Sequence, residues 1–252
     1  MTAVAALTVV ALTVVAPAGA PAVAPAVAPA VAVTVIGGAR PERAAEHPPT
    51  TVIGPVEAQA ARTPAAPALV LAGGAVVTYG ELNAAANRLA RALAARGARP
   101  GTVVGLGRLR PVDQLTALLA VAKSGAAFLV PEPGELGEPG ELGHLGEPGD
   151  TGVPAAATPL LVLEEDDLAV GGGLATDPPR ALTPQHPLCV APGPGSRPSA
   201  ARLTHGEADR RVRELQAAYR LGPDDRVLQT GLPTWAYFWP LRTGAAIVLA
   251  DG

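Results

Sequence analysis

The stretch Thr102–Val130, T-V-V-G-L-G-R-L-R-P-V-D-Q-L-T-A-L-L-A-V-A-K-S-G-A-A-F-L-V, decides the fold of this chain. Thr102–Leu106 is apolar and rich in β-branched side chains, which is typical of a buried strand. A helix is predicted over about Val112–Lys123, because leucine and alanine recur there at helical spacing. A Ser-Gly pair ends that helix, and Ala126–Val130 is a second apolar run. The order strand, helix, strand predicts a parallel sheet with a crossover helix.

The residues before this stretch predict a hairpin and two helices. Ala68–Leu71 and Ala75–Thr78 are short apolar runs separated by a Gly-Gly pair, which is a hairpin signal. Thr78 is followed three residues later by Glu81, and this capping box predicts the start of a helix. Leucines at helical spacing follow it. A shorter helix is predicted over Val56–Arg62.

Strands and one helix also follow the central stretch. A second T-x-x-E box predicts a helix that starts near Thr204 and carries Val212, Leu215 and Tyr219 on one face. The chain is therefore predicted to be an α/β protein with parallel sheets and crossover helices. The further apolar runs predicted as strands are Pro159–Leu163, Pro187–Val190, Arg226–Thr230 and Ala245–Leu249.

Two segments differ in composition from the rest of the chain. Met1–Ala39 carries no charged side chain and repeats A-L-T-V-V and P-A-V-A units, which is typical of a low-complexity tail without a fixed fold. Glu132–Asp150 repeats E-P-G-E-L-G, and its prolines and glycines argue against a helix. We therefore expect a disordered tail and linker over residues 1–52 and one domain over residues 53–252, with an acidic, turn-rich insertion over residues 132–150.

Composition limits the functions that are open to this chain. The net charge of −3, with no extended basic face, argues against a nucleic-acid partner. The single cysteine, Cys189, excludes an intramolecular disulfide and is expected to be a buried thiol. The four histidines lack the spacing of metal ligands. The first apolar run lacks the positive charges of a secretory signal, and Pro17 interrupts it before it could span a membrane, so a cytoplasmic protein is expected.

The stretch Ala191–His205, A-P-G-P-G-S-R-P-S-A-A-R-L-T-H, is the candidate functional loop. Glycines between a strand and a helix let backbone N–H groups approach phosphate oxygens. Phosphate loops usually add hydroxyls and a lysine, but this loop has few hydroxyls and no lysine. Taken alone, it is more simply interpreted as a surface turn. The candidate phosphate ligands are Gly193, Gly195, Ser196, Arg197 and Thr204.

Three segments resemble one family. E-A-Q-A-A-R-T-P-A-A-P-A-L (57–69), V-T-Y-G-E-L-N-A-A-A-N-R-L-A-R-A-L (77–93) and V-A-K-S-G-A-A-F-L-V-P-E-P (121–133) are similar, in order and spacing, to the amino-acid adenylation domains of nonribosomal peptide synthetases. These domains belong to the adenylate-forming, AMP-binding ligase superfamily. The resemblance implies part of the N-terminal lobe of that fold. It also implies a reaction of ATP, Mg²⁺ and an amino acid to aminoacyl-AMP and pyrophosphate, with other synthetase modules as partners.

The same resemblance implies that functional groups are missing. The family's phosphate loop reads close to T-S-G-S-T-G-x-P-K-G, whereas here Ser199 stands at the position of the lysine and Pro194 removes a backbone N–H donor. The family's aspartate, which pairs with the amino group of the substrate, is absent before Trp235. The later half of the domain, with its catalytic lysine, is not among these residues, and Lys123, the chain's only lysine, lies in a structural motif. We therefore expect a truncated, degenerate domain without catalytic residues, with weak or no cofactor binding and no activity alone.

Three other interpretations stay open at this stage. The chain is active if a separate C-terminal lobe completes it in trans. It is a non-catalytic scaffold if the acidic insertion and the tail bind partners. It folds poorly if it is the product of a decayed gene, which would suit the charge-free start.

Overall fold

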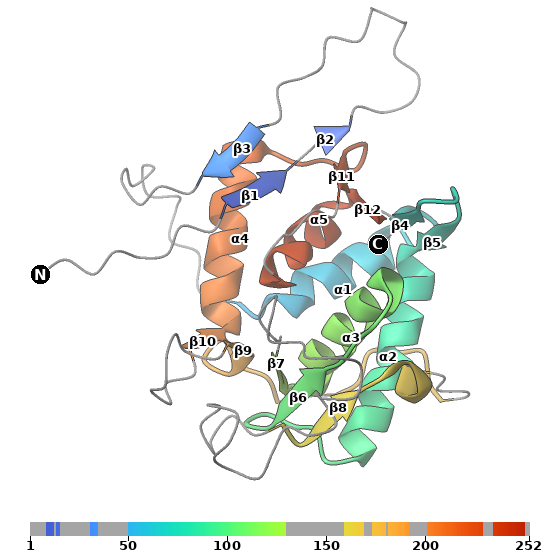
Figure 1. The fold of residues 1–252 in the computed structure, drawn as a ribbon, viewed down its shortest axis with the longest axis vertical. Helices are drawn as coiled ribbons and strands as arrows, with labels where there is room; N and C mark the ends of the chain where they lie inside the picture. The colour runs from blue at the N-terminus through green and yellow to red at the C-terminus, as the bar shows by residue number, and fades with distance from the viewer. Residues whose placement is uncertain are drawn as a thin grey trace, which may run out of the picture.

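The computed structural model describes residues 9–12, 14–15, 31–34, 50–129, 159–168, 173–179, 181–191, 201–228 and 234–249. Most of these residues form two five-stranded sheets with helices between and beside them (Figure 1). Near the N-terminus, β1 (Val9–Leu12) pairs with β3 (Val31–Thr34), and β2 (Val14–Val15) joins the edge of one larger sheet. These strands lie in the segment expected to be a disordered tail. The acidic insertion, residues 132–150, lies outside the described residues.

The first large sheet has the strand order β2-β11-β12-β4-β5. The strands β11 (Arg226–Leu228), β12 (Ala246–Leu249) and β4 (Pro67–Leu71) are parallel, and β5 (Val76–Thr78) returns antiparallel to β4. The predicted hairpin is therefore confirmed. Its Gly-Gly turn places Gly74 at a φ of 80°, a conformation that glycine adopts without strain.

The second large sheet has the order β10-β9-β7-β6-β8. Four of its strands are parallel neighbours: β9 (Pro187–Ala191), β7 (Ala127–Leu129), β6 (Val103–Leu106) and β8 (Leu161–Leu163). Helix α3 (Pro111–Ser124) crosses over from β6 to β7, as predicted. The α/β class with parallel sheets and crossover helices is thus confirmed.

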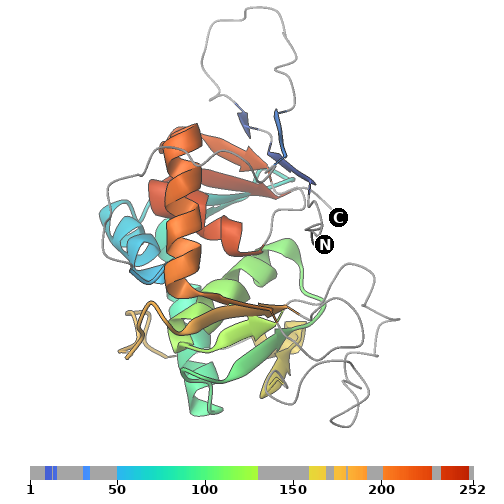
Figure 2. The ribbon, with the colours of Figure 1, turned by 90° about the vertical axis from the view of Figure 1, so that its left-hand side faces the viewer.

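A pair of helices separates the two sheets. Helix α2 (Tyr79–Ala95) packs along α3, contacting β4 and β5 of the first sheet, whereas α3 contacts β6 and β7 of the second. Helix α1 (Ile53–Arg62) begins three residues before its predicted start and packs on α5 (Phe238–Thr243). Figure 2 shows the two sheets stacked, with α4 (His205–Tyr219) running along one side past both.

Helices α3 and α4 differ in how much of their surface is buried. In α3, every residue from Ala117 to Ser124 is buried, because both α2 and the second sheet cover this helix. In α4, Val212 is fully buried, whereas Tyr219, at the end of the same helix face, is 38% exposed. Tyr219 is the last residue of α4, and its ring lies beside Trp239 at a centroid distance of 5.7 Å. No helix in the described part of the chain is both long and apolar enough to cross a membrane.

Candidate functional site

The candidate phosphate loop closes a hairpin at the edge of the second sheet. β9 is antiparallel to β10 (Ala201–Thr204), with Ala191 opposite Ala201 and Val190 opposite Arg202. Helix α4 starts directly after β10. The sequence predicted a strand, a loop and a helix, and it missed β10, which is short and contains Ala and Arg. The predicted ligands Gly193, Gly195, Ser196 and Arg197 lie in 192–200, outside the described residues.

Thr204, the remaining predicted ligand, caps α4. Its Oγ1 accepts a hydrogen bond from the backbone N–H of Glu207 at 3.2 Å and donates one to Glu207 Oε2 at 3.0 Å. The Thr204 N–H donates to the same carboxylate at 2.9 Å, which completes the predicted capping box. Hydrogen bonds from Thr204 lower the pKa of the Glu207 carboxyl. The Thr204 hydroxyl is therefore engaged as both donor and acceptor.

The backbone N–H groups at the start of α4 are engaged as well. The His205 N–H donates to the carbonyl of His186 at 3.0 Å, and the Gly206 N–H donates to the carbonyl of Pro184 at 2.8 Å. Together with the Glu207 N–H, three donors of the first turn have partners within the protein. A helix N-terminus attracts phosphate through such donors when they are free. Here any phosphate would have to be held by the loop itself.

The capping role of Thr204 can be measured by substitution. We expect Thr204→Ala to lower the free energy of unfolding by about 1 kcal/mol, which is the usual effect of losing an N-cap hydroxyl. The matched control is Thr78→Ala, since Thr78 forms the same capping box with Glu81 at the start of α2. Urea unfolding should give similar losses for both variants. A loss at Thr78 with none at Thr204 would contradict the capping assignment.

Cys189 lies on β9, two residues before the end of the strand. Burial raises the pKa of its thiol to about 11, so the thiol is protonated near neutral pH. A protonated thiol is a weak nucleophile. Cys189 was expected to be buried, and the structure shows it half-buried instead.

Lys123 is held inside the protein by two carboxylates. Its side chain is 0% exposed, and its Nζ lies 2.6 Å from Glu57 Oε1 of α1 and 2.7 Å from Asp177 Oδ1. Burial alone would raise the pKa of Asp177, but hydrogen bonds from Lys123, Asn83 and Asn87, with the Lys123 charge, hold this pKa below its ordinary value. Lys123 lies near the end of α3, as predicted, and its ammonium is paired with these two carboxylates.

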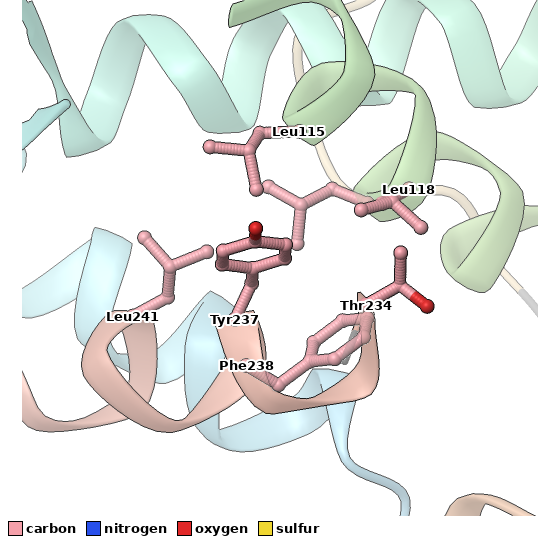
Figure 3. Close-up of a pocket in the computed structure, with 7 residues that line it drawn as sticks. Leu115, Leu118, Thr234, Tyr237, Phe238 and Leu241 are labelled. Carbon is pink, nitrogen blue, oxygen red and sulfur yellow. The ribbon is translucent and has the colours of Figure 1, made fainter. Parts of the chain in front are cut away.

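An apolar pocket lies between α3 and the segment made of η4 (Thr234–Tyr237) and α5 (Figure 3). It is a shallow, partly open depression without room for a water molecule, and it has no charged lining residue. The lining is mostly apolar, with the hydroxyl groups of Thr234 and Tyr237 as its polar atoms, and the depression is too small for a ligand. In the sequence, this place is marked only by the run of aromatic side chains over Trp235–Trp239. The lining residues are Leu115, Leu118, Leu119, Thr234, Tyr237, Phe238 and Leu241.

Two other expectations concern charged ligands. The aspartate of the family was expected to be missing before Trp235, and residues 229–233 lie outside the described part. Among the described residues, no group of three His, Cys, Asp or Glu side chains could hold a metal ion.

Known proteins match this chain in both sequence and fold. Residues 56–138 match the family model of AMP-binding enzymes. Phosphinothricin tripeptide synthetase PhsB of Streptomyces viridochromogenes is 34% identical over 77% of this chain. The probable non-canonical nonribosomal peptide synthetase CymA of Salinispora arenicola is 32% identical over 71%. The chain spans 18% of the length of PhsB and 2% of CymA.

Solved structures agree with these relatives. The AMPPNP-bound form of the nonribosomal peptide synthetase FmoA3 superimposes with a TM-score of 0.66 at 26% identity, covering 82% of this chain and 23% of FmoA3. The N-terminal domain of FACL13 from Mycobacterium tuberculosis has the same fold, with a TM-score of 0.64 at 19% identity, covering 79% of this chain and 57% of that domain. By sequence and by fold, this chain is an AMP-binding, adenylation-type segment of the kind found in nonribosomal peptide synthetases.

Proposed function

We propose that this chain is an adenylation-type nucleotide lobe that binds ATP and Mg²⁺ weakly and does not form an aminoacyl adenylate unaided. One observation carries the proposal. The only lysine of the chain is fully buried and paired with Glu57 and Asp177, so no lysine ammonium is available to a phosphate. Phosphoryl chemistry on ATP depends on cations that stabilise the developing negative charge.

The surroundings of the candidate loop support the same proposal. The first N–H groups of α4 already donate to carbonyl and hydroxyl oxygens of the protein, so they add nothing to a phosphate cradle. In the loop sequence, Pro194 lacks a donor and Ser199 replaces the expected lysine. Two arginines remain near the loop: Arg197 in the loop sequence, and Arg202, which is exposed on β10. Weak phosphate binding follows from these few donors.

Other peptide-synthetase modules are the proposed partners, because this chain corresponds to a small part of each relative. Within such an assembly, a second lobe could supply the missing cation. Exchange of pyrophosphate into ATP, with a panel of amino acids, tests the proposal for the purified chain. We expect no exchange above the protein-free background. Amino-acid-dependent exchange by the chain alone would refute the proposal.

Restoring the lysine provides a sharper test. We expect Ser199→Lys to tighten the binding of AMPPNP by about tenfold or more, because a hydrogen bond from a charged donor contributes about 1.5–3 kcal/mol. Ala200→Lys is the matched control, since it adds the same charge one residue away, and it should change the affinity much less. Calorimetric titration measures both dissociation constants. Equal effects of the two lysines would show that the gain is a general charge effect and that the loop does not hold phosphate in the family's manner.

A further inference from the structure

A polar stripe on α2 holds a segment that is distant in sequence. Asn83, Asn87 and Arg91 are spaced four residues apart and so lie on one face of the helix. Each of them donates hydrogen bonds to residues 173–179, which we name the strap. The strap therefore lies along α2 (Tyr79–Ala95) without forming a strand or helix of its own.

The bonds that hold the strap are polar, and three of them reach its backbone carbonyls. Arg91 donates to the carbonyls of Leu174 at 3.3 Å and Thr176 at 3.0 Å, and to the Thr176 hydroxyl at 3.1 Å. Asn87 donates to the carbonyl of Ala175 at 2.5 Å. The one large apolar side chain of the strap, Leu174, is 65% exposed and gives it no apolar anchor.

The strap contributes one charged contact, and that contact covers Lys123. Asp177 accepts a hydrogen bond from Lys123 at 2.7 Å and one from Asn83 at 3.2 Å. The Asp177 side chain is 44% exposed, whereas Lys123 is completely buried. The second carboxylate at Lys123 is that of Glu57 on α1, whose Oε1 lies 2.6 Å from Lys123 Nζ. Lys123 is thus enclosed by α1 on one side and by the strap on the other.

We propose that the strap opens as a unit while both sheets stay folded, and that the ion pair between Lys123 and Asp177 is the latch that keeps it closed. Opening exchanges a few partly exposed hydrogen bonds for bonds to water and uncovers little apolar surface. Segments with such contacts open locally well below the free energy of global unfolding. In the open state, Lys123 stays beside Glu57, and its amine becomes accessible to solvent.

Acylation of Lys123 measures this opening directly. The full chain is treated with an N-hydroxysuccinimide acetate ester over a range of urea concentrations, and acetylation at Lys123 is followed by mass spectrometry. We expect labelling at low urea with a rate that rises much less steeply than the population of unfolded protein. Asp177→Asn should raise the labelling rate about tenfold, which corresponds to about 1.4 kcal/mol.

Asp167→Asn is the matched control for this experiment. Asp167 pairs with Arg96 at 2.7 Å near the end of α2, so the variant breaks an ion pair outside the strap and should leave the labelling rate unchanged. The double variant Asn83→Ala with Arg91→Ala loosens the strap with both partners of the latch retained, and it should also accelerate labelling. Equal rates in Asp177→Asn and Asp167→Asn would overturn the proposal. Labelling that follows global unfolding at every urea concentration would do the same.

Discussion

Replacing Asp209 with alanine is expected to lower the free energy of unfolding by about 3 kcal/mol, since removing one member of a buried ion pair typically costs about 3–5 kcal/mol. Asp209 is 1% exposed on α4. Its carboxylate lies 2.6 Å from Arg213 Nη2 and 3.0 Å from Arg242 Nη1, and it accepts a hydrogen bond from the Thr50 hydroxyl at 3.1 Å. This carboxylate thus joins α4 to α5 and to the start of α1. We place the expected loss at the lower end of this range because the side chains of both arginines are partly exposed.

Glu214→Ala is the matched control for Asp209→Ala. Glu214 lies on the same helix and pairs with Arg210, but these side chains are 49% and 64% exposed, so the loss should stay within about 1 kcal/mol. Asp209→Asn keeps the shape but only one of the two acceptor oxygens, so its loss should fall between those of the two alanine variants. Urea unfolding followed by circular dichroism gives all three values. If Asp209→Ala cost no more than Glu214→Ala, the cluster would not join these elements.

The Asp209 cluster illustrates a limit of prediction from sequence. Asp209 and Arg213 are four residues apart, which is typical of an exposed helical pair. The partners that make the site a buried junction, Arg242 and Thr50, are 33 and 159 residues away from Asp209. Contacts over such separations depend on how α5 and the start of α1 pack on α4, and no local spacing reports that packing.

Local sequence patterns did predict the elements whose contacts are made between residues close in sequence. The capping boxes at Thr78 and Thr204, the hairpin of β4 and β5, and the crossover through α3 each depend on neighbouring residues, and all are confirmed. Strand β10 was missed because its pairing with β9, rather than its own composition, makes it a strand. Sequence reasoning therefore succeeded where the interaction partner lies within one element or the next.

The same distinction applies to the candidate phosphate site. The loop between β9 and α4 was predicted from its glycines. The sequence did not predict that the first backbone N–H groups of α4 donate to other parts of the protein. The carbonyls of Pro184 and His186 accept these hydrogen bonds, and both residues precede β9. A motif of a strand, a glycine-rich loop and a helix thus leaves open whether the helix donors face the loop or another part of the protein. In this chain, the segment just before β9 accepts the hydrogen bonds of these donors, and a phosphate-loop motif does not include that segment.

Lys123→Met is expected to cost about 3 kcal/mol, although methionine preserves most of the apolar stem. The substitution leaves Glu57 and Asp177 close to each other without the ammonium that separates their charges. Glu57 is only 13% exposed, so water compensates its charge poorly. Arg210→Met, which removes one positive charge from a 64% exposed side chain, should change the free energy of unfolding by less than about 1 kcal/mol.

The contribution of the two stranded carboxylates can be separated from that of the lost lysine. Adding Glu57→Gln and Asp177→Asn to Lys123→Met removes both charges, so the triple variant should be more stable than Lys123→Met alone, even though it carries two further substitutions. If the losses in the free energy of unfolding from the three substitutions simply add, Lys123 acts through its packing and not through its charge. The three residues belong to α3, α1 and the strap. Higher stability of the triple variant would therefore also show that the charge of Lys123 links these three elements.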